Sequence, residues 1–160
     1  MMSIKFVFTL LLALALPGSR RAGWIRPQET EMSVTEGKSV NLLCYYDAST
    51  GGTVDLYWYR QYPNQAPEYI LYRGWGYTGK GDASFAVERF YSKSAADTTN
   101  LYIRNLLLAD TATYYCALED GEYKLIFGKG THVTVEPKSQ PPTKPSVFVM
   151  KNGTKVACLV

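Results

Sequence analysis

The sequence predicts an all-β protein folded as a two-layer sandwich. Between residues 23 and 136, short apolar runs alternate with polar residues at a period of two, turn-forming residues separate the runs, and no stretch carries a helical stripe. A sandwich buries one face of each strand and leaves the other in water, which produces this alternation. With 160 residues, 46% of them hydrophobic, the chain can build one domain with a core and part of a second.

Residues 1–22 have the layout of a secretory signal peptide. Lys5 precedes an apolar run over 6–16 that ends at a Pro-Gly pair. The run is too short to cross a bilayer, so we expect the mature chain to start near Gly23. No other run approaches the roughly 20 apolar residues of a membrane span. The chain is therefore expected to be secreted, or to be a piece of a protein that is anchored further on.

The strands expected within the first domain show a clear inward face. The residues predicted to point into the core are Val40, Leu42, Cys44, Leu101, Ile103, Val133 and Val135. Turns are expected where Gly, Pro, Asn, Asp and Ser gather, at 36–38, 49–52, 62–67, 73–81 and 94–100.

A domain boundary is expected at residues 137–145, where four prolines in nine residues predict a stiff linker. Beyond it, 146–160 contains two strand-like runs around Asn152 and Gly153, a hairpin signal. Two strands are not stable alone. We therefore expect the chain to end early in a second β domain.

Cysteine, tryptophan and tyrosine spacing identifies the type of sandwich. Cys44 and Cys116 are 72 positions apart, Trp58 follows Cys44 by 14, and Tyr114 precedes Cys116 by two. In an immunoglobulin sandwich such cysteines are bridged through the core, with the tryptophan packed on the disulfide and the tyrosine bonded to upstream backbone. Cys158 is the odd cysteine, so its partner is expected beyond this sequence or in another chain.

Arg89 and Asp110 are expected to form an ion pair that closes one end of the sandwich. Together with Tyr114 they are assigned to stability, not to an active site. Because the only histidine, His132, is expected on the outward face of a strand, and the sequence places no nucleophile or acid beside it, an enzyme is disfavoured. No catalytic residue, metal site or cofactor is predicted, and a net charge of +3 gives no indication of nucleic-acid binding.

Several stretches resemble antigen-receptor variable domains, most closely those of T-cell receptor chains of the alpha and delta group. They are WYRQYPNQAPEYILY (58–72), YYCALE (114–119), KLIFGKGTHVTVEP (124–137) and SQPPTKPSVFVMKNGTKVACLV (139–160). The last two are similar to a joining segment and to the start of the constant region of the delta chain. The resemblance implies an immunoglobulin variable-type sandwich over 23–136, and over 146–160 the first strands of a truncated constant-type domain.

By this resemblance the chain is an antigen-recognition chain of a gamma-delta T-cell receptor. Its three antigen-binding loops are expected at 48–55, 73–79 and 117–126, clustered at one end of the sandwich. The residues expected to contact antigen are Ser49, Thr50, Asp55, Arg73, Trp75, Tyr77, Glu119, Asp120, Glu122, Tyr123 and Lys124. Trp75 and Tyr77 among small residues suit a binding surface, although Trp75 could instead pack on the framework. The acidic third loop favours a basic ligand or is simply solvated.

A partner chain is expected on the outer face of one sheet. Since Trp58, Tyr114 and Cys116 point inward, their neighbours must point outward. An outward aromatic row would be costly on a monomer, and the resemblance implies that a gamma-chain variable domain packs on it. The residues assigned to this face are Tyr59, Gln61, Ala66, Pro67, Tyr69, Tyr115 and Phe127, with Gln61 hydrogen-bonding its counterpart.

The resemblance further implies a place at the extracellular side of the plasma membrane, with signalling subunits bound through parts that this sequence does not contain. Asn152 begins an N-glycosylation sequon. The antigen, protein or lipid, is not identified. Two other receptors fit the residues less well, namely a non-rearranging V-set adhesion or co-receptor protein, which would lack a joining segment, and an antibody light chain, whose constant region would differ.

The Gly-Lys-Gly triplets at 79–81 and 128–130 do not predict a phosphate-binding loop. Such a loop needs Gly-Lys followed by Ser or Thr between a strand and a helix. Here a glycine follows Lys129, and a strand comes next. We expect 128–130 to form a β-bulge through which the last strand leaves the third loop, and 79–81 to form a turn.

Overall fold

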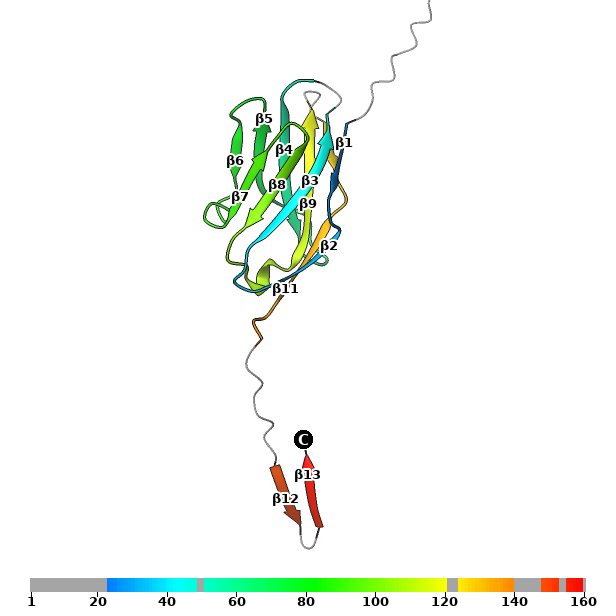
Figure 1. The fold of residues 1–160 in the computed structure, drawn as a ribbon, viewed down its shortest axis with the longest axis vertical. Coiled ribbons are helices and arrows are strands. Elements are labelled where there is room, and N and C mark those ends of the chain that lie inside the picture. Colours follow the sequence, from blue (N-terminus) through cyan, green and yellow to red (C-terminus); the bar gives the residue numbers. More distant parts are fainter. Residues whose placement is uncertain (1–22, 49–50, 121–123, 140–147, 153–154, 160) are drawn as a thin grey trace, which may run out of the picture.

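A computed structural model of the chain describes residues 23–48, 51–120, 124–139, 148–152 and 155–159 (Figure 1). The predicted signal peptide at 1–22 lies outside the described residues. The same is true of four residues assigned to antigen binding, Ser49, Thr50, Glu122 and Tyr123.

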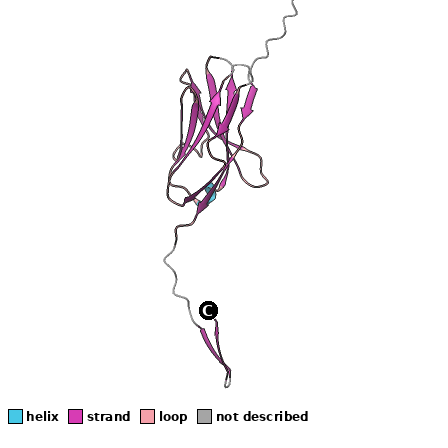
Figure 2. Cartoon of the chain, turned by 45° about the vertical axis from the view of Figure 1, so that its right-hand side comes forward, coloured by secondary structure: helices cyan, strands magenta, loops and turns pink. Residues whose placement is uncertain are grey.

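Two sheets packed face to face form the main body (Figures 1 and 2). In spatial order, the first sheet contains β1 (Trp24–Pro27), β3 (Val40–Asp47), β8 (Thr98–Ile103) and β7 (Phe90–Ser94). The second contains β2 (Glu31–Thr35), β11 (Thr131–Glu136), β9 (Ala112–Asp120), β4 (Val54–Gln61), β5 (Glu68–Trp75) and β6 (Lys80–Asp82), with β10 (Lys124–Phe127) also paired to β9. The predicted all-β, variable-type two-sheet sandwich is confirmed.

The core lies between the sheets and is built by the predicted alternation. Along β3, Val40, Leu42 and Cys44 are buried, whereas Asn41 between them is exposed. The inward residues predicted on β8 and β11 are buried in the same way, namely Leu101, Ile103, Val133 and Val135. One helical turn that the sequence analysis missed, the 3₁₀ turn η1 (Leu108–Asp110), precedes β9.

The N-terminal segment passes from one sheet to the other. Strand β1 is antiparallel to β3, with Pro27 opposite Cys44, whereas β2 is parallel to β11, with Val34 opposite Val135. Proline has no N–H to continue a ladder, and β1 ends at Pro27. A single short segment therefore supplies an edge strand to each sheet, and the shortness of both strands limits unwanted pairing at these edges.

Two of the predicted turns are shorter than expected because the strands extend into them. The turn predicted at 73–81 is confined to 76–79: β5 continues to Trp75, and Lys80 and Gly81 belong to β6 instead of forming a turn. The turn predicted at 94–100 is confined to 95–97 between β7 and β8. In both places, backbone pairing with a neighbouring strand outweighs the turn preference of glycine and polar residues.

The predicted bulge after Phe127 is confirmed. Phe127 lies opposite Ala117, and Thr131 lies opposite Tyr114, so a step of four residues on one side matches a step of three on β9. The N–H of Gly128 donates to the carbonyl of Cys116 at 2.9 Å. One extra residue on a strand is the definition of a bulge.

Gly130 is required in this bulge because β9 lies against it. A Cβ at Gly130 would lie 2.4 Å from Cγ2 of Thr113 and 2.9 Å from the ring of Tyr115. We expect Gly130→Ala to lower the free energy of unfolding by about 2 kcal/mol, as overpacking in a rigid site does. Gly52→Ala is the matched control, since nothing lies within 4 Å of its Cβ position. Denaturant unfolding of both variants checks this, and equal effects would contradict it.

Tyr46 brings a titratable group into the core. Its ring is 4% exposed, and its hydroxyl donates to the carbonyl of Ala95 at 2.6 Å. Burial, with a smaller contribution from Asp97, raises the pKa of Tyr46 to about 12. The folded state thus favours the neutral phenol. In the unfolded chain the phenol has its ordinary pKa of about 10. The stabilisation by Tyr46 is therefore complete below pH 10 and is lost as the pH rises through 12, the pKa in the folded state.

Tyr46→Phe is therefore expected to remove a hydrogen bond worth about 1 kcal/mol at neutral pH. The difference in unfolding free energy between the parent chain and Tyr46→Phe should shrink between pH 10 and 12. Denaturant titrations at pH 8, 10, 11 and 12 measure this difference. A difference that stays constant over the range would show that this phenol does not titrate with unfolding.

Beyond the sandwich, β12 (Phe148–Asn152) and β13 (Lys155–Leu159) form a separate two-stranded antiparallel sheet. Asn152 is opposite Lys155 and is the last residue of β12. The predicted hairpin around Asn152 and Gly153 is confirmed by this antiparallel pairing, while Gly153 itself lies outside the described residues. Cys158 is a strand residue opposite Val149. Within the described part of the chain, no helix has the length and apolarity needed to span a membrane.

Candidate functional site

The centre of the sandwich is fixed by the disulfide and the tryptophan that the sequence singled out. Cys44 on β3 is bonded to Cys116 on β9, with their Cα atoms 6.6 Å apart. Trp58 on β4 lies opposite Cys116 and is 1% exposed. Its indole N–H donates to Oγ1 of Thr99 at 3.3 Å, so the buried ring has a partner for its polar edge.

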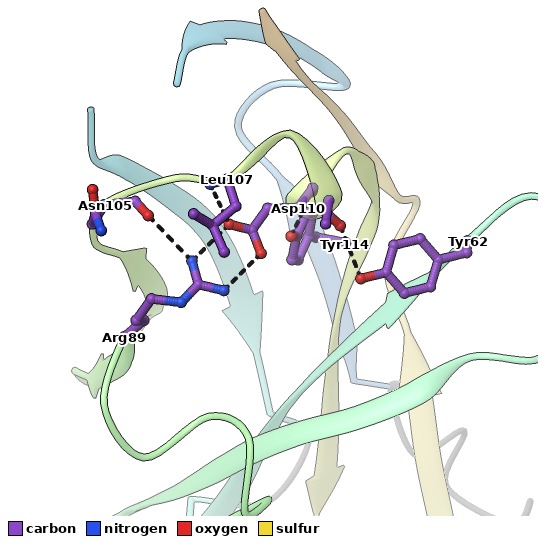
Figure 3. A network of polar contacts seen from close by, with 7 residues as sticks. Tyr62, Arg89, Asn105, Leu107, Asp110 and Tyr114 are labelled. Atoms are coloured by element: carbon purple, nitrogen blue, oxygen red, sulfur yellow. Dashed lines mark hydrogen bonds and ion pairs between the residues drawn. The ribbon is translucent and has the colours of Figure 1, made fainter. Parts of the chain in front are cut away.

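An ion-pair network closes one end of the sandwich (Figure 3). The guanidinium of Arg89 donates to both carboxylate oxygens of Asp110, at 2.7 and 2.9 Å. The same carboxylate accepts the N–H of Leu107 at 2.8 Å and is buried. Hydrogen bonding by Asp110 raises the pKa of Arg89. Tyr114 donates to the carbonyl of Asp110 at 2.8 Å, which is the expected tyrosine bond to upstream backbone.

The opposite end carries the connections expected to form the binding surface (Figure 1). They join β3 to β4 over 48–53, β5 to β6 over 76–79, and β9 to β10 over 121–123. The predicted loops were longer at each place. Asp55, Trp75 and Glu119 lie on strand ends, and so do Arg73, Asp120 and Lys124. These residues flank the connections instead of forming them.

Tyr77 is held at this end by a cradle of two glycines. A Cβ at Gly74 or Gly79 would lie 2.4 or 2.3 Å from the Tyr77 ring, and the N–H of Gly74 donates to the carbonyl of Gly79 at 2.7 Å. The hydroxyl of Tyr77 donates to the carboxylate of Asp55. This hydrogen bond, together with burial, raises the pKa of Tyr77 to about 12. The ring is 45% exposed, so it is fixed in orientation and still open to solvent.

Tyr57, which was not among the expected site residues, links β4 to β9 close to the end of β9. Its hydroxyl donates to Oε2 of Glu119 at 2.8 Å, and its ring stacks on Tyr72 with centroids 5.3 Å apart. Burial, followed by the hydrogen bond to Glu119, raises the pKa of Tyr57. The signal was available, because Tyr57 precedes the inward Trp58 and therefore points outward, as Tyr59 does.

Arg73 has its guanidinium engaged within the second sheet. It lies on β5, and its guanidinium is 2.6 Å from Oδ1 of Asp82 on β6. It also donates to the carbonyl of Gly81 at 3.3 Å. The structure thus places Arg73 on β5, not in the expected loop, and these contacts join two neighbouring strands at the sheet edge.

The outer face of the second sheet gathers aromatic residues into one patch. The ring of Tyr59 lies 5.8 Å from Tyr69 and 5.4 Å from Phe127, centroid to centroid. Tyr115 donates to Oε1 of Gln61 at 3.1 Å. We name this patch the tyrosine face, made of Tyr57, Tyr59, Gln61, Tyr69, Tyr72, Tyr115 and Phe127.

Gln61 is already oriented within the chain. Its amide N–H₂ donates to the carbonyl of Gln65 at 2.9 Å while its oxygen accepts from Tyr115. One amide hydrogen remains for a partner. Phe127 is 49% exposed, and Pro67 and Ala66, which precede β5, are exposed. Of the residues expected at a pairing surface, the structure brings together Tyr59, Gln61, Tyr69, Tyr115 and Phe127. Tyr57 and Tyr72 lie on the same face.

Two other residues expected to contact antigen lie at the end of the sandwich that carries these connections, which we call the binding end. Trp75 is 39% exposed at the end of β5, opposite Val54, and Lys124 is exposed at the start of β10. In the described part of the chain, no three His, Cys, Asp or Glu side chains gather as metal ligands do.

Comparison with known proteins agrees with this geometry. A family model described as the immunoglobulin V-set domain matches residues 27–136. The human "T cell receptor alpha chain MC.7.G5" is 32% identical over 96% of this chain and 56% of its own length. The mouse "T-cell receptor alpha chain V region CTL-F3" is 31% identical over 66% of this chain and 76% of its own length. The mouse "T-cell receptor alpha chain V region PHDS58" is 34% identical over 67% of this chain and 79% of its own length.

The chain thus spans little more than half the length of the human relative, and all three relatives are named as alpha chains. The resemblance to T-cell receptor chains is confirmed at this level, and the expectation of a non-enzymatic protein is confirmed with it. The V-set match, the bridged core with Trp58, and the relatives together show that the chain belongs to the immunoglobulin V-set family, as a T-cell receptor variable-type chain.

Proposed function

We propose that this chain recognises antigen as one half of a T-cell receptor of the gamma-delta type. The observation that carries the proposal is the tyrosine face, because an outward aromatic row is costly on a monomer and supports the presence of a partner chain. The partner would place its own three loops next to those of this chain. Antigen would then contact a composite surface.

The residues from the start of β10 onward support a gamma chain as the partner. KLIFGKGTHVTVEP and the stretch from Ser139 to Val160 resemble the joining and constant segments of the delta chain. A beta chain is the second candidate, favoured by the alpha-chain names of the three relatives. Either candidate would pack on the tyrosine face, so the two are distinguished by how well each fits that face.

Antigen contact is assigned to the rim formed by Trp75, Tyr77 and Lys124, together with the residues of the connections at 48–53 and 121–123. Tyr77 is pre-oriented by Gly74 and Gly79, and a fixed aromatic ring loses little entropy on binding. Glu119 is engaged by Tyr57. We therefore assign Glu119 to positioning the third connection, and the remaining acids of that stretch, Asp120 and Glu122, to antigen contact.

Pairing can be tested by co-expressing the chain with soluble gamma or beta chains and measuring the recovered heterodimer. Phe127→Ala should lower its recovery about tenfold, because truncating an aromatic interface anchor costs on the order of 1–2 kcal/mol. Gln61→Glu should do the same by burying a charge and losing the amide donors. Val87→Ala is the control, since Val87 is 68% exposed outside the tyrosine face.

Recovery with gamma chains only supports the delta assignment, and recovery with beta chains only would replace it by an alpha-type assignment. Undiminished pairing of both Phe127→Ala and Gln61→Glu would show that the tyrosine face is not the interface. A non-rearranging adhesion or co-receptor protein remains the alternative of another class. Genomic DNA distinguishes it, because one uninterrupted exon through residues 115–137 would rule out a rearranged receptor.

The proposal includes the extracellular side of the plasma membrane as the location, signalling subunits as further partners and a glycan at Asn152. These rest on family membership and on the sequon. The glycan is checked by measuring the mass of the secreted chain before and after deglycosylation. The Asn152→Gln variant should show no such difference in mass.

A further inference from the structure

The outer face of the first sheet, on the far side of the sandwich from the tyrosine face, carries a surface groove of about 590 Å³. It runs over β3, β8 and β7, which are neighbours in that sheet (Figure 1). The residues that line it are Asn41, Tyr91, Lys93, Asn100, Tyr102 and Arg104. The volume lies within the roughly 300–1,000 Å³ of small-ligand sites.

The strand register orders these residues into two rows. Asn41 lies opposite Tyr102, which lies opposite Tyr91. In the neighbouring row, Asn100 lies opposite Lys93. Side chains directly opposite one another on the same face have Cβ atoms about 5 Å apart. The two tyrosines therefore form the middle of the groove, and they are 51% and 37% exposed.

Two cations flank this tyrosine pair along the strand direction. Lys93 follows Tyr91 by two residues on β7, and Arg104 follows Tyr102 by two just after β8, on the antiparallel neighbour. They therefore lie on opposite sides of the aromatic row. Neither has a carboxylate partner among the described residues, and the residues lining the groove include no acid.

The asparagines supply directed amide groups. The Oδ1 atom of Asn100 accepts the backbone N–H of Lys93 at 3.1 Å, which leaves its N–H₂ group as the free donor. Asn41 is exposed at the other side of Tyr102. The groove thus combines exposed ring faces, amide donors and two unpaired positive charges.

We propose that this groove binds an acidic polysaccharide of the sulfated glycosaminoglycan class. Sugar rings would lie on Tyr91 and Tyr102, hydroxyl groups would hydrogen-bond Asn41 and Asn100, and sulfate or carboxylate groups would bind Lys93 and Arg104. The placement of one cation on each side of the rings matches a polymer that carries anionic groups at regular intervals. Charge-assisted hydrogen bonds supply most of the affinity.

The site is independent of the proposed receptor function. It lies on the other sheet from the tyrosine face and uses none of the strand ends that border the antigen-binding connections. A paired receptor would still present it. Its ligand would be a component of cell surfaces or matrix near the receptor, distinct from antigen.

Binding of the full chain to immobilised heparin, measured by surface plasmon resonance at 50 and 300 mM salt, tests the proposal. The double variant Lys93→Gln/Arg104→Gln should lower the affinity at least about tenfold, and Tyr91→Ala about fivefold. The matched control Lys38→Gln/Lys129→Gln removes the same charge from two exposed lysines outside the groove and should change the affinity less than about twofold.

Three outcomes would overturn the proposal. The first is no binding of heparin at either salt concentration. The second is an equal loss in the groove and control variants, which would show attraction to net charge alone. The third is competition by polyglutamate as effective as that by heparin, which would make the groove a site for acidic peptides. Unchanged melting temperatures of the variants ensure that losses of binding come from the groove.

Discussion

Replacing Cys44 and Cys116 together by alanine is expected to lower the free energy of unfolding by about 4 kcal/mol in the chain-entropy account. The bond joins residues 72 positions apart and links the two sheets through the core. Its loss frees a long loop in the unfolded chain and leaves space beside Trp58. Since domains of this size are stable by about 5–15 kcal/mol, this loss removes roughly a quarter to four fifths of the stability, and the yield of folded, secreted protein should fall.

Two measurements check this effect. They are the secretion yield of the double alanine variant and the denaturant unfolding of the variant protein that is secreted and purified. Cys158→Ser is the control, because Cys158 belongs to β13, outside the sandwich. It should leave the unfolding transition of the sandwich in place. If the double alanine variant unfolded within about 1 kcal/mol of the parent, the unfolded chain would have to retain structure that makes the bridge redundant.

Arg89→Ala is expected to have the second largest effect, a loss of about 3 kcal/mol. Asp110 is 1% exposed. Of the groups that donate to its carboxylate in Figure 3, only the N–H of Leu107 remains in this variant. A buried charge without its counterion is costly. Arg89→Lys should lose less, because it keeps the charge but cannot donate to both oxygens in the plane of a guanidinium.

Glu68→Gln provides the comparison for an ion pair at the surface. Glu68 binds Arg60 at 2.7 Å, but its side chain is 47% exposed, so the change should cost less than about 1 kcal/mol. A double-mutant cycle of Arg89→Ala and Asp110→Ala isolates the coupling between the two side chains. Equal losses for Arg89→Ala and Glu68→Gln would contradict the role of burial assigned here.

Most of the sandwich could be predicted from local pattern because each strand has one dry face. Val40, Leu42 and Cys44 show the alternation, and the same physics places Trp58 inward. The strand ends at the binding end could not be predicted. Gly74 and Trp75 looked like part of a turn, yet β5 continues through both because pairing with β4 and the packing of Tyr77 on Gly74 stabilise the extended backbone.

The tyrosine face shows a second limit of local pattern. The pairing of β4 with β5 shifts between Trp58 and Tyr59, so Tyr59 lies opposite Tyr69 while Trp58 lies opposite Leu71. The residue left over, Ile70, reverses the alternation, and Tyr72 therefore joins Tyr69 on the outer face. An alternation of apolar and polar residues with a period of two does not predict where such a bulge lies. Likewise, the contact between Arg73 and Asp82 depends on β6, which was expected to be a turn.

The parallel pairing of β2 with β11 determines how the domain responds to a pulling force. Five residue pairs, from His132 opposite Glu31 to Glu136 opposite Thr35, hold β11 on one side, and β9 holds it on the other. Tension between the binding end and the chain after Glu136 acts along β11. Its ladder bonds must then break together in shear, not one after another as in unzipping, so the N-terminal strand acts as a mechanical clamp.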